Sequence, residues 1–241
     1  MPTSKIDKTG WYTRVSGILG TRFPIILGPM RLITMGAMAA EVSNCGGLGV
    51  IASSGLSADS LRAEIKTALE HTNCPLGVNI PVYRPNALES LEIAIEMGVK
   101  MIYTSAGNPA NMIKRIREAG LTVIHKVSNE KTALKAESAG VDAVVAMGFE
   151  AGGHVGREKI TTMCLIPRLV DILSIPVIAA GGIADARGVV AAFALGAAGV
   201  EIGTRFVAST ECPASDFFKA GVHSAVSRAT LPLRPVEMST R

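Results

Sequence analysis

The sequence contains few aromatic residues and no cysteine pattern typical of a metal site or a disulfide framework. Phenylalanine, tyrosine and tryptophan make up 4% of the 241 residues, so branched aliphatic side chains must fill the core, as they do on buried parallel strands. The four cysteines form no CxxC pair and no metal-like spacing, which is typical of a reducing compartment. We therefore expect neither a metal site nor disulfide bonds.

Concentrated charge and long apolar runs are also absent. The net charge is +4 and the lysine and arginine residues are scattered, which argues against nucleic-acid binding. The apolar stretches are too short to span a membrane, and the N-terminal segment MPTSKIDKTG is polar and unlike a signal sequence. We expect a cytoplasmic protein that acts on a small molecule and binds neither membrane nor nucleic acid, with a homodimer as an open alternative.

Several common catalytic motifs are missing. The sequence has no GxxxxGK[ST] loop, no GxSxG elbow and no GxGxxG turn. These absences argue against P-loop enzymes, α/β-hydrolases and dinucleotide-binding folds.

Eight short apolar runs recur about 25 residues apart, the length of one strand–helix unit. Short connections favour parallel strands with right-handed crossovers, and eight such units close a barrel. We predict one α/β domain over residues 1–241, a (β/α)8 TIM barrel, with an open doubly wound sheet as the competing fold. The predicted strands begin near Pro24, Leu48, Leu76, Val99, Thr122, Ala143, Pro176 and Gly199.

Capping signals place helices between these runs. A serine followed by acidic residues predicts a helix over residues 57–72, and Asn108-Pro109 predicts the start of another. A further helix is expected around residues 215–225. A glycine before an aliphatic residue is typical of a helix-to-strand joint, because glycine readily adopts the left-handed conformation that ends a helix. This signal occurs at Gly98, Gly120 and Gly140.

Two strand ends predict a phosphate site. The seventh run ends in Ala180-Gly181-Gly182, and the eighth ends in Gly203-Thr204. TIM barrels often bind phosphate through the backbone of the loops after strands seven and eight, where glycine permits close approach. The alternative is that these glycines only form tight turns.

A long glycine-rich loop, GFEAGGHVGREKITT, follows the sixth run. Loops at this end of a barrel carry the active site. His154 follows Gly152 and Gly153 in this loop, where an imidazole can serve as a general base or hold an anion. Another possibility is that His154 is structural.

The fifth run contains adjacent basic residues, His125 and Lys126. Because side chains alternate along a strand, one of the two must face the barrel interior and the other the helices. A cation at the barrel mouth can stabilise a cofactor phosphate or the charge of a reduced flavin. Alternatively, Lys126 extends to solvent.

The first and third runs end in further candidate binding residues. Gly28-Pro29-Met30 offers a small residue and a soft thioether that can lie beside an aromatic ring. Asn79 carries an amide that can donate to and accept from a heterocycle. Each signal is weak alone, since methionine in a barrel is usually part of the core.

Together these strand ends form an ordered series of motifs. It runs from Pro24 to Pro213 as GPM, GVN, SAGNP, HK, GVDAV, GFEAGGHVG, LIPRLVD, IPVIAAGGIAD, ALGA and GTRFVAS-ECP. This series resembles the nitronate monooxygenase (2-nitropropane dioxygenase) family of FMN-dependent TIM-barrel oxidoreductases. The resemblance covers nearly the whole chain.

The resemblance implies FMN as the cofactor, alkyl nitronates as substrates and dioxygen as the oxidant. It implies that His154 is the catalytic residue, facing the flavin. It also implies a set of cofactor-binding residues: Gly28, Pro29, Met30, Asn79, Lys126, Gly152, Gly153, Ala180, Gly181, Gly182, Gly203 and Thr204.

Other readings stay open on the same motifs. The flavin enoyl-thioester reductases of bacterial fatty acid synthesis and a set of NADH:quinone reductases share most of them, so NAD(P)H with a quinone or an enoyl thioester is the alternative substrate pair. Family members usually continue past strand eight into a helical lid, whereas residues 207–241 form a short tail, so we expect this lid to be largely absent. A flavin-binding protein with little catalysis, or a barrel that binds phosphate without flavin, is therefore a further alternative.

Overall fold

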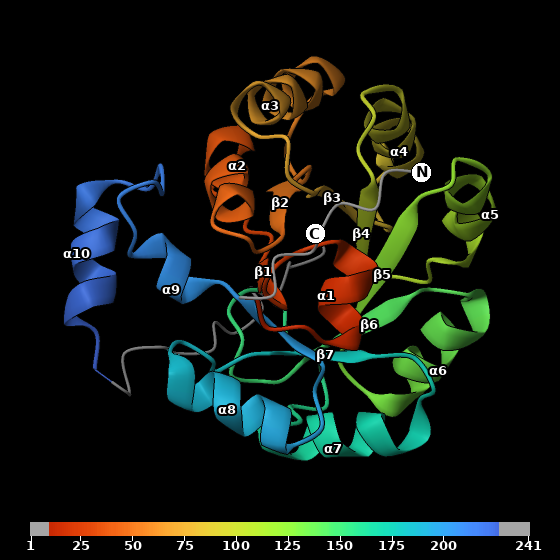
Figure 1. Ribbon diagram of the computed structural model, residues 1–241, viewed down its shortest axis with the longest axis vertical. Helices are drawn as coiled ribbons and strands as arrows, with labels where there is room; N and C mark the ends of the chain where they lie inside the picture. Colours follow the sequence, from red (N-terminus) through yellow and green to blue (C-terminus); the bar gives the residue numbers. More distant parts are fainter. Residues whose placement is uncertain (1–9, 227–241) are drawn as a thin grey trace, which may run out of the picture.

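The computed structural model describes residues 10–226, in which eight parallel strands alternate with helices (Figure 1). All eight predicted strands are present, so the strand prediction is confirmed. The strands are β1 (Ile25–Leu27), β2 (Gly49–Ala52), β3 (Leu76–Pro81), β4 (Met101–Ser105), β5 (Thr122–Val127), β6 (Ala143–Met147), β7 (Val177–Ala180) and β8 (Gly199–Ile202). The helices are α1 (Arg14–Leu19), α2 (Gly36–Asn44), α3 (Ala58–His71), α4 (Ala87–Glu96), α5 (Ala110–Glu118), α6 (Glu130–Ala139), α7 (Thr162–Ile172), α8 (Ala186–Ala194), α9 (Thr204–Val207) and α10 (Asp216–Ser224).

The sheet closes on itself. Its order is β1-β8-β7-β6-β5-β4-β3-β2, and a parallel bridge between Ile26 and Leu48 joins its two ends. The Leu27 N–H donates to the Leu48 carbonyl at 2.9 Å, which strengthens this seam. The molecule is therefore a (β/α)8 TIM barrel, as predicted, and the open-sheet alternative is wrong.

Alternate residues of most strands pack into two large apolar cores, and a third, smaller cluster contains Leu27 of β1, Met38 of α2 and Val207 of α9. The outer core joins strand residues such as Val123 and Val127 to the surrounding helices. The inner core joins Ile26, Ile124 and Ile178 to α1 and contains no residue of the surrounding helices. Because these two sets alternate along the strands, the faces of β5 are settled: Lys126 shares the inner face with Ile124, and His125 shares the outer face with Val123.

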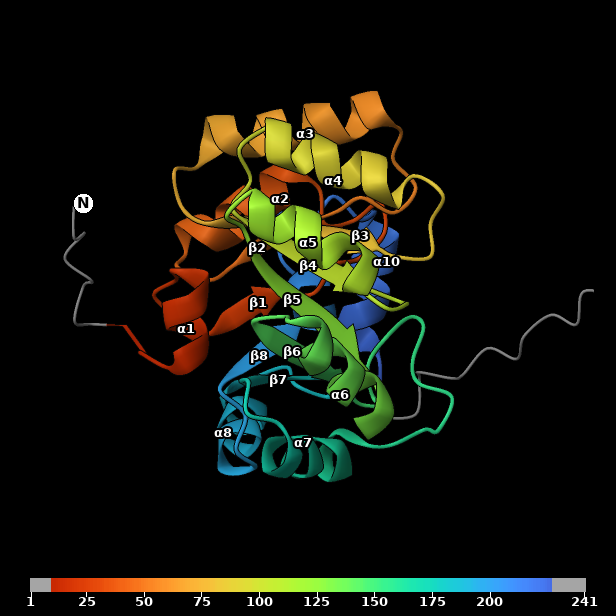
Figure 2. The same cartoon turned by 90° about the vertical axis from the view of Figure 1, so that its right-hand side faces the viewer.

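Helix α1, which the sequence analysis did not predict, closes the N-terminal end of the barrel. Its Val15 and Leu19 belong to the inner core, and Val15 lies against Gly199, the first residue of β8. Figure 2 shows α1 at the end of the barrel opposite the long loop between β6 and α7. One end of the barrel is thus sealed, and the C-terminal ends of the strands form the other.

Local signals set the helix ends as expected. Ser57 caps α3 by accepting a hydrogen bond from the Ser60 N–H, and Ser215 caps α10 in the same way. Asn108 accepts from the Ala110 N–H at the start of α5. The predicted helix-ending glycines, Gly98, Gly120 and Gly140, all have positive φ.

Helix α10 lies apart from the barrel (Figure 1), and none of its residues is buried. It forms part of the tail predicted over 207–241, of which residues 227–241 lie outside the described residues. Across residues 10–226, no helix has both the length and the apolar character needed to cross a bilayer.

Candidate active site

The candidate site residues lie at or near the C-terminal ends of six strands, around one barrel mouth. Each sits at the end of a strand or in the loop that follows it, where active sites of this fold are found. Gly28, Pro29 and Met30 follow β1; Asn79 lies in β3 and Lys126 in β5; Gly152, Gly153 and His154 lie between β6 and α7; Ala180 ends β7, before Gly181 and Gly182; Gly203 follows β8 and Thr204 begins α9.

The loop after β7 needs glycine for conformational reasons. Gly181 and Gly182 have φ values of 107° and 71°, a region that other residues rarely adopt. A side chain at Gly181 would also place its Cβ 3.0 Å from the Ala151 backbone nitrogen. Backbone conformation therefore requires glycine at both positions, and this requirement is compatible with a role in binding.

Helix α7 fixes this loop in place. The Thr162 hydroxyl donates to the Gly181 carbonyl oxygen at 2.9 Å and lies 3.1 Å from the Glu150 carboxylate. Glu150 also accepts from the Thr162 N–H at 2.9 Å, which places a negative charge at the N-terminus of α7, where it is stabilising. The loops after β6 and β7 are thus held together by one threonine.

Small residues leave space where β1 and β8 meet at the mouth. A Cβ added to Gly203 would lie 3.6 Å from the Met30 sulfur. A Cβ added to Gly28 would lie 3.3 Å from Oε1 of Glu201 and 3.2 Å from the Ile202 carbonyl oxygen. The structure thus brings Gly28, Met30 and Gly203 together.

A buried polar cluster lies directly beneath these residues. Nζ of Lys126 donates to Oε1 of Glu201 at 2.7 Å, and the Tyr103 hydroxyl donates to Oε2 of the same carboxylate. Tyr103 is fully buried, and burial together with the adjacent carboxylate raises the pKa of its phenol well above the usual value. The phenol therefore stays protonated and acts as a donor to Glu201.

Sequence reasoning missed Glu201 and Tyr103. A signal was present for Glu201, since it is the one charged residue in the apolar strand GVEI and alternates with Val200 and Ile202, which face the helices. The pairing also changes the expectation for Lys126. This residue is neither an unpaired cation nor extended to solvent, but forms an ion pair across the barrel.

Asn79 lies on the inner face of β3, because its neighbours in the sequence, Val78 and Ile80, belong to the outer core. The residue is 5% exposed. Its amide nitrogen donates to the Tyr103 carbonyl oxygen at 3.0 Å and lies 3.1 Å from the Ser105 hydroxyl. These bonds fix the orientation of the amide at the ends of β3 and β4.

His154 is exposed on the loop between β6 and α7. The ends of this loop are joined by a hydrogen bond from the Phe149 N–H to the Ile160 carbonyl at 2.8 Å. Its flanks are held by Asn129, which donates to Glu158 at 2.9 Å. A fixed base therefore carries an exposed tip that contains Gly152, Gly153 and His154.

His125 faces away from the site, as its position on β5 requires. Its Nδ1 lies 2.8 Å from the Thr104 hydroxyl in the outer core. Burial disfavours the charged imidazolium and lowers the pKa of His125 to about 4. The imidazole is therefore a neutral core residue, which leaves His154 as the histidine at the barrel mouth.

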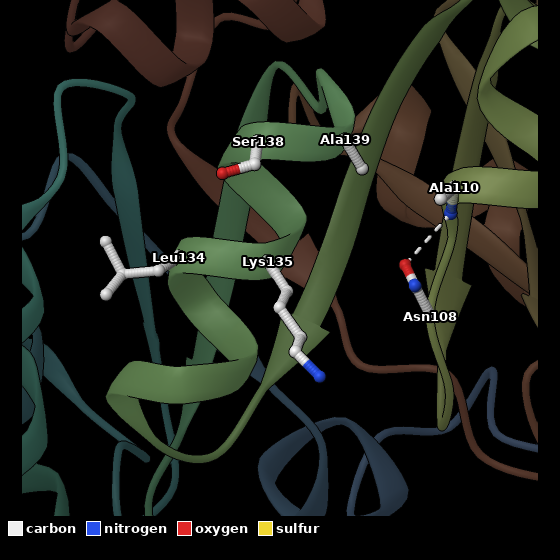
Figure 3. A pocket seen from close by; sticks show the side chains of 6 residues that line it. All are labelled: Asn108, Ala110, Leu134, Lys135, Ser138 and Ala139. Carbon is white, nitrogen blue, oxygen red and sulfur yellow. Dashed lines mark hydrogen bonds between the residues drawn. The ribbon is translucent and has the colours of Figure 1, made fainter.

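A shallow groove of about 400 Å³ lies elsewhere, between α6 and the start of α5 (Figure 3). Its lining includes Leu134, Lys135 and Asn108, and the Asn108 side chain is already used to cap α5. It lies on the outer helical layer, so we do not assign it to the active site. Among residues 10–226, no group of histidine, cysteine and acidic side chains is arranged to hold a metal ion.

Comparison with known proteins identifies the family to which this barrel belongs. The sequence profile of the nitronate monooxygenase family matches residues 12–241. This chain belongs to the nitronate monooxygenase family. The membership confirms the resemblance stated above and the expected class of enzyme, an oxidoreductase.

Two curated relatives show the range of the family. A probable nitronate monooxygenase of Staphylococcus saprophyticus is 34% identical, over 91% of this chain and 74% of its own length. The (3aS,4S,5R,7aS)-5-hydroxy-7a-methyl-1-oxo-octahydro-1H-indene-4-carboxyl-CoA dehydrogenase of Mycobacterium tuberculosis is 35% identical, over 86% of this chain and 59% of its own length. The chain thus spans about three quarters of the first relative and less than two thirds of the second.

Two solved structures have folds similar to that of this chain. FabK from Thermotoga maritima has a TM-score of 0.89 and 42% identity, covering 92% of this chain and 70% of that protein. Nitroalkane oxidase from Streptomyces ansochromogenes has a TM-score of 0.78 and 26% identity, covering 87% of this chain and 72% of that protein. The barrel of this chain is therefore similar to those of two differently named proteins.

Proposed function

We propose that this chain binds FMN at the C-terminal mouth of its barrel and oxidises alkyl nitronates with dioxygen. The observation that carries the proposal is the convergence, at one mouth, of the glycine turn after β7, the space that Gly203 leaves beside Met30 and the buried Lys126–Glu201 pair. Membership of the nitronate monooxygenase family supports the reaction class.

The residues at the mouth fit an FMN phosphate. Within residues 10–226, no hydrogen bond uses the N–H of Gly182, Gly203 or Thr204 as its donor. Backbone N–H groups without partners, in loops where glycine leaves the backbone accessible, suit an anionic phosphate. We assign the phosphate to Gly181, Gly182, Gly203 and Thr204.

The remaining candidates fit the flavin ring. Met30 offers an apolar thioether beside Gly203, and Asn79 offers an amide held by Tyr103 and Ser105. Ala180, Gly28 and Pro29 are small or rigid residues that let a planar ring approach the strand ends. FMN, when bound, supplies the redox chemistry that no side chain at this mouth can provide.

His154 is assigned to the substrate. Its imidazole is exposed on a loop whose base is fixed, so it can reach a small anion at the mouth. A protonated imidazole would hold a nitronate anion, and a neutral one would accept the α-proton of a nitroalkane.

The test is to add FMN to the purified protein, remove oxygen and mix it with an alkyl nitronate. We expect loss of the oxidised flavin absorbance and its recovery when air is admitted. We expect His154→Ala to slow this loss because the nitronate anion is held less well. With a neutral nitroalkane, whose α-proton must be removed, we expect the loss to slow by about 100-fold or more, the usual contribution of a general base. His71→Ala, at an exposed helix end, is the matched control. Nitronate oxidation at the wild-type rate by His154→Ala would remove His154 from the mechanism.

A second candidate is NAD(P)H-dependent reduction of an enoyl thioester, with a quinone as the other possible acceptor. It is favoured by the greater similarity to FabK than to nitroalkane oxidase, and by the carboxyl-CoA dehydrogenase among the relatives. Mixing the FMN-loaded protein with NADH or NADPH without oxygen separates the two. Rapid flavin bleaching by either dinucleotide supports the reductase, and no bleaching by them removes it.

A further inference from the structure

The buried cluster at the barrel mouth contains two opposite charges that neutralise each other. Lys126 comes from β5 and Glu201 from β8, and their side chains are 17% and 7% exposed. The Tyr103 phenol, from β4, occupies the second carboxylate oxygen. With Tyr103 protonated, the three side chains carry no net charge.

Two hydrogen bonds hold the Glu201 carboxylate beside the Lys126 ammonium. One oxygen accepts from the ammonium and the other from the phenol, while Nζ of Lys126 also lies 5.4 Å from the centre of the Tyr103 ring. An ammonium over an aromatic face gains further stabilisation. These contacts fix both charges in one arrangement.

The cluster also reaches the residues assigned to the cofactor. Glu201 is separated from Gly203 by one residue, and its Oε1 would lie 3.3 Å from a Cβ at Gly28. Charges this deeply buried are weakly screened, so they act over several ångströms on a group bound at the mouth.

We propose that Glu201 is a positioning residue that holds Lys126 inside the barrel and cancels its charge at the flavin site. This inference rests on the proposed FMN site. Reduction adds negative charge to a flavin, and an unpaired ammonium nearby would favour the reduced form. Because Glu201 neutralises Lys126, the bound cofactor gains little of that stabilisation. Glu201 therefore keeps the reduction potential of bound FMN lower than it would be beside an unpaired Lys126 ammonium.

Charge-neutral substitutions test this with a readout other than turnover. Glu201→Gln leaves the ammonium unpaired, so the midpoint potential of bound FMN should become more positive. Lys126→Met leaves the carboxylate unpaired, so the potential should become more negative. The double variant removes both charges and should return close to the wild-type potential. Glu92→Gln, which breaks an ion pair with Arg115 on the outer helices, is the matched control and should leave the potential unchanged.

The dissociation constant of FMN is measured first for every variant. Failure of the wild-type protein to bind FMN overturns the proposed function and this inference with it. Binding with a potential that does not change in Glu201→Gln or in Lys126→Met overturns the inference alone. If Glu201→Gln does not fold, two lysine variants still test the inference. The midpoint potential of bound FMN should become more negative in Lys126→Met and should stay at the wild-type value in Lys126→Arg, which keeps the charge.

Discussion

The Thr162 hydroxyl donates a hydrogen bond to the Gly181 carbonyl oxygen at 2.9 Å, so the first residue of α7 holds the loop that follows β7. Gly181 belongs to the proposed phosphate site, and Thr162 is 9% exposed. A residue outside that site therefore determines the conformation of a residue within it.

Thr162→Val should destabilise the protein and weaken FMN binding. The substitution keeps the side-chain volume but leaves the Gly181 carbonyl without this donor, which costs about 1–3 kcal/mol. The free energy of unfolding from urea titration and the dissociation constant of FMN from fluorescence measure the two effects. Thr162→Ser retains the hydroxyl and should stay near wild type. Equal stability of the serine and valine variants would show that the hydroxyl is not needed.

Gly181→Ala should cost more than about 1 kcal/mol of stability. Alanine tolerates a φ of 107° poorly, and its Cβ would meet the Ala151 nitrogen at 3.0 Å. Gly152→Ala is the control in the neighbouring loop, because a Cβ there meets nothing within 4 Å. Comparison of the two unfolding free energies is the measurement. We expect the control to remain within about 0.5 kcal/mol of wild type, and a similar loss in both variants would contradict the conformational argument.

Protonation of His125 should destabilise the fold in mildly acidic solution. Its pKa is about 4 in the folded protein, against 6.5 without burial, so the unfolded chain binds the proton more readily between these values. Stability is therefore lost as the pH falls from 6.5 towards 4, by about 3 kcal/mol in total. Urea unfolding across this range measures the slope.

His125→Gln should flatten that pH dependence, because glutamine does not titrate and can still bond to the Thr104 hydroxyl. His71→Gln, at an exposed helix end, should keep the wild-type slope. An unchanged slope in His125→Gln would assign the acid sensitivity to other groups.

Tyr103→Phe should destabilise the protein by about 1–3 kcal/mol, because one oxygen of the buried Glu201 carboxylate loses its donor. In the wild type, Tyr103 should remain protonated at a pH where an unburied phenol ionises, because burial and the adjacent carboxylate raise its pKa. Alkaline absorbance titration of the wild type and of Tyr103→Phe should therefore show the same amplitude near pH 10. A smaller amplitude in the variant would mean that Tyr103 titrates normally.

The repeat of apolar runs was sufficient to predict the barrel, because each strand–helix unit has its own local signals. Helix α1 was not predictable in this way. It has local end signals, a capping box between Thr13 and Ser16 and a left-handed Gly20, but only six residues, RVSGIL, lie between them, and they pack against the open end of a barrel that exists only once all strands have assembled. Tertiary packing decided this element.

Site residues were predictable from the sequence where the backbone conformation requires glycine. They were harder to predict where two side chains meet across the barrel. The positive φ values of Gly181 and Gly182 agree with the glycine signal. Alternation placed His125 and Lys126 on opposite faces, but only the closed sheet decided which face was which. The lone charge in the strand GVEI marks Glu201 as unusual, but Glu201 and Lys126 lie on strands that are not neighbours in the sheet, so no local pattern could identify them as partners.

The hydrogen bond between Phe149 and Ile160 closes the loop after β6 at its base. The tip of this loop, residues 152–154, is exposed, so changes in its length or composition can leave the register of the strands unchanged. Selection for a new substrate can act on this tip while the loops after β7 and β8 are inherited intact. Such modularity would let one scaffold diversify into enzymes with unrelated substrates.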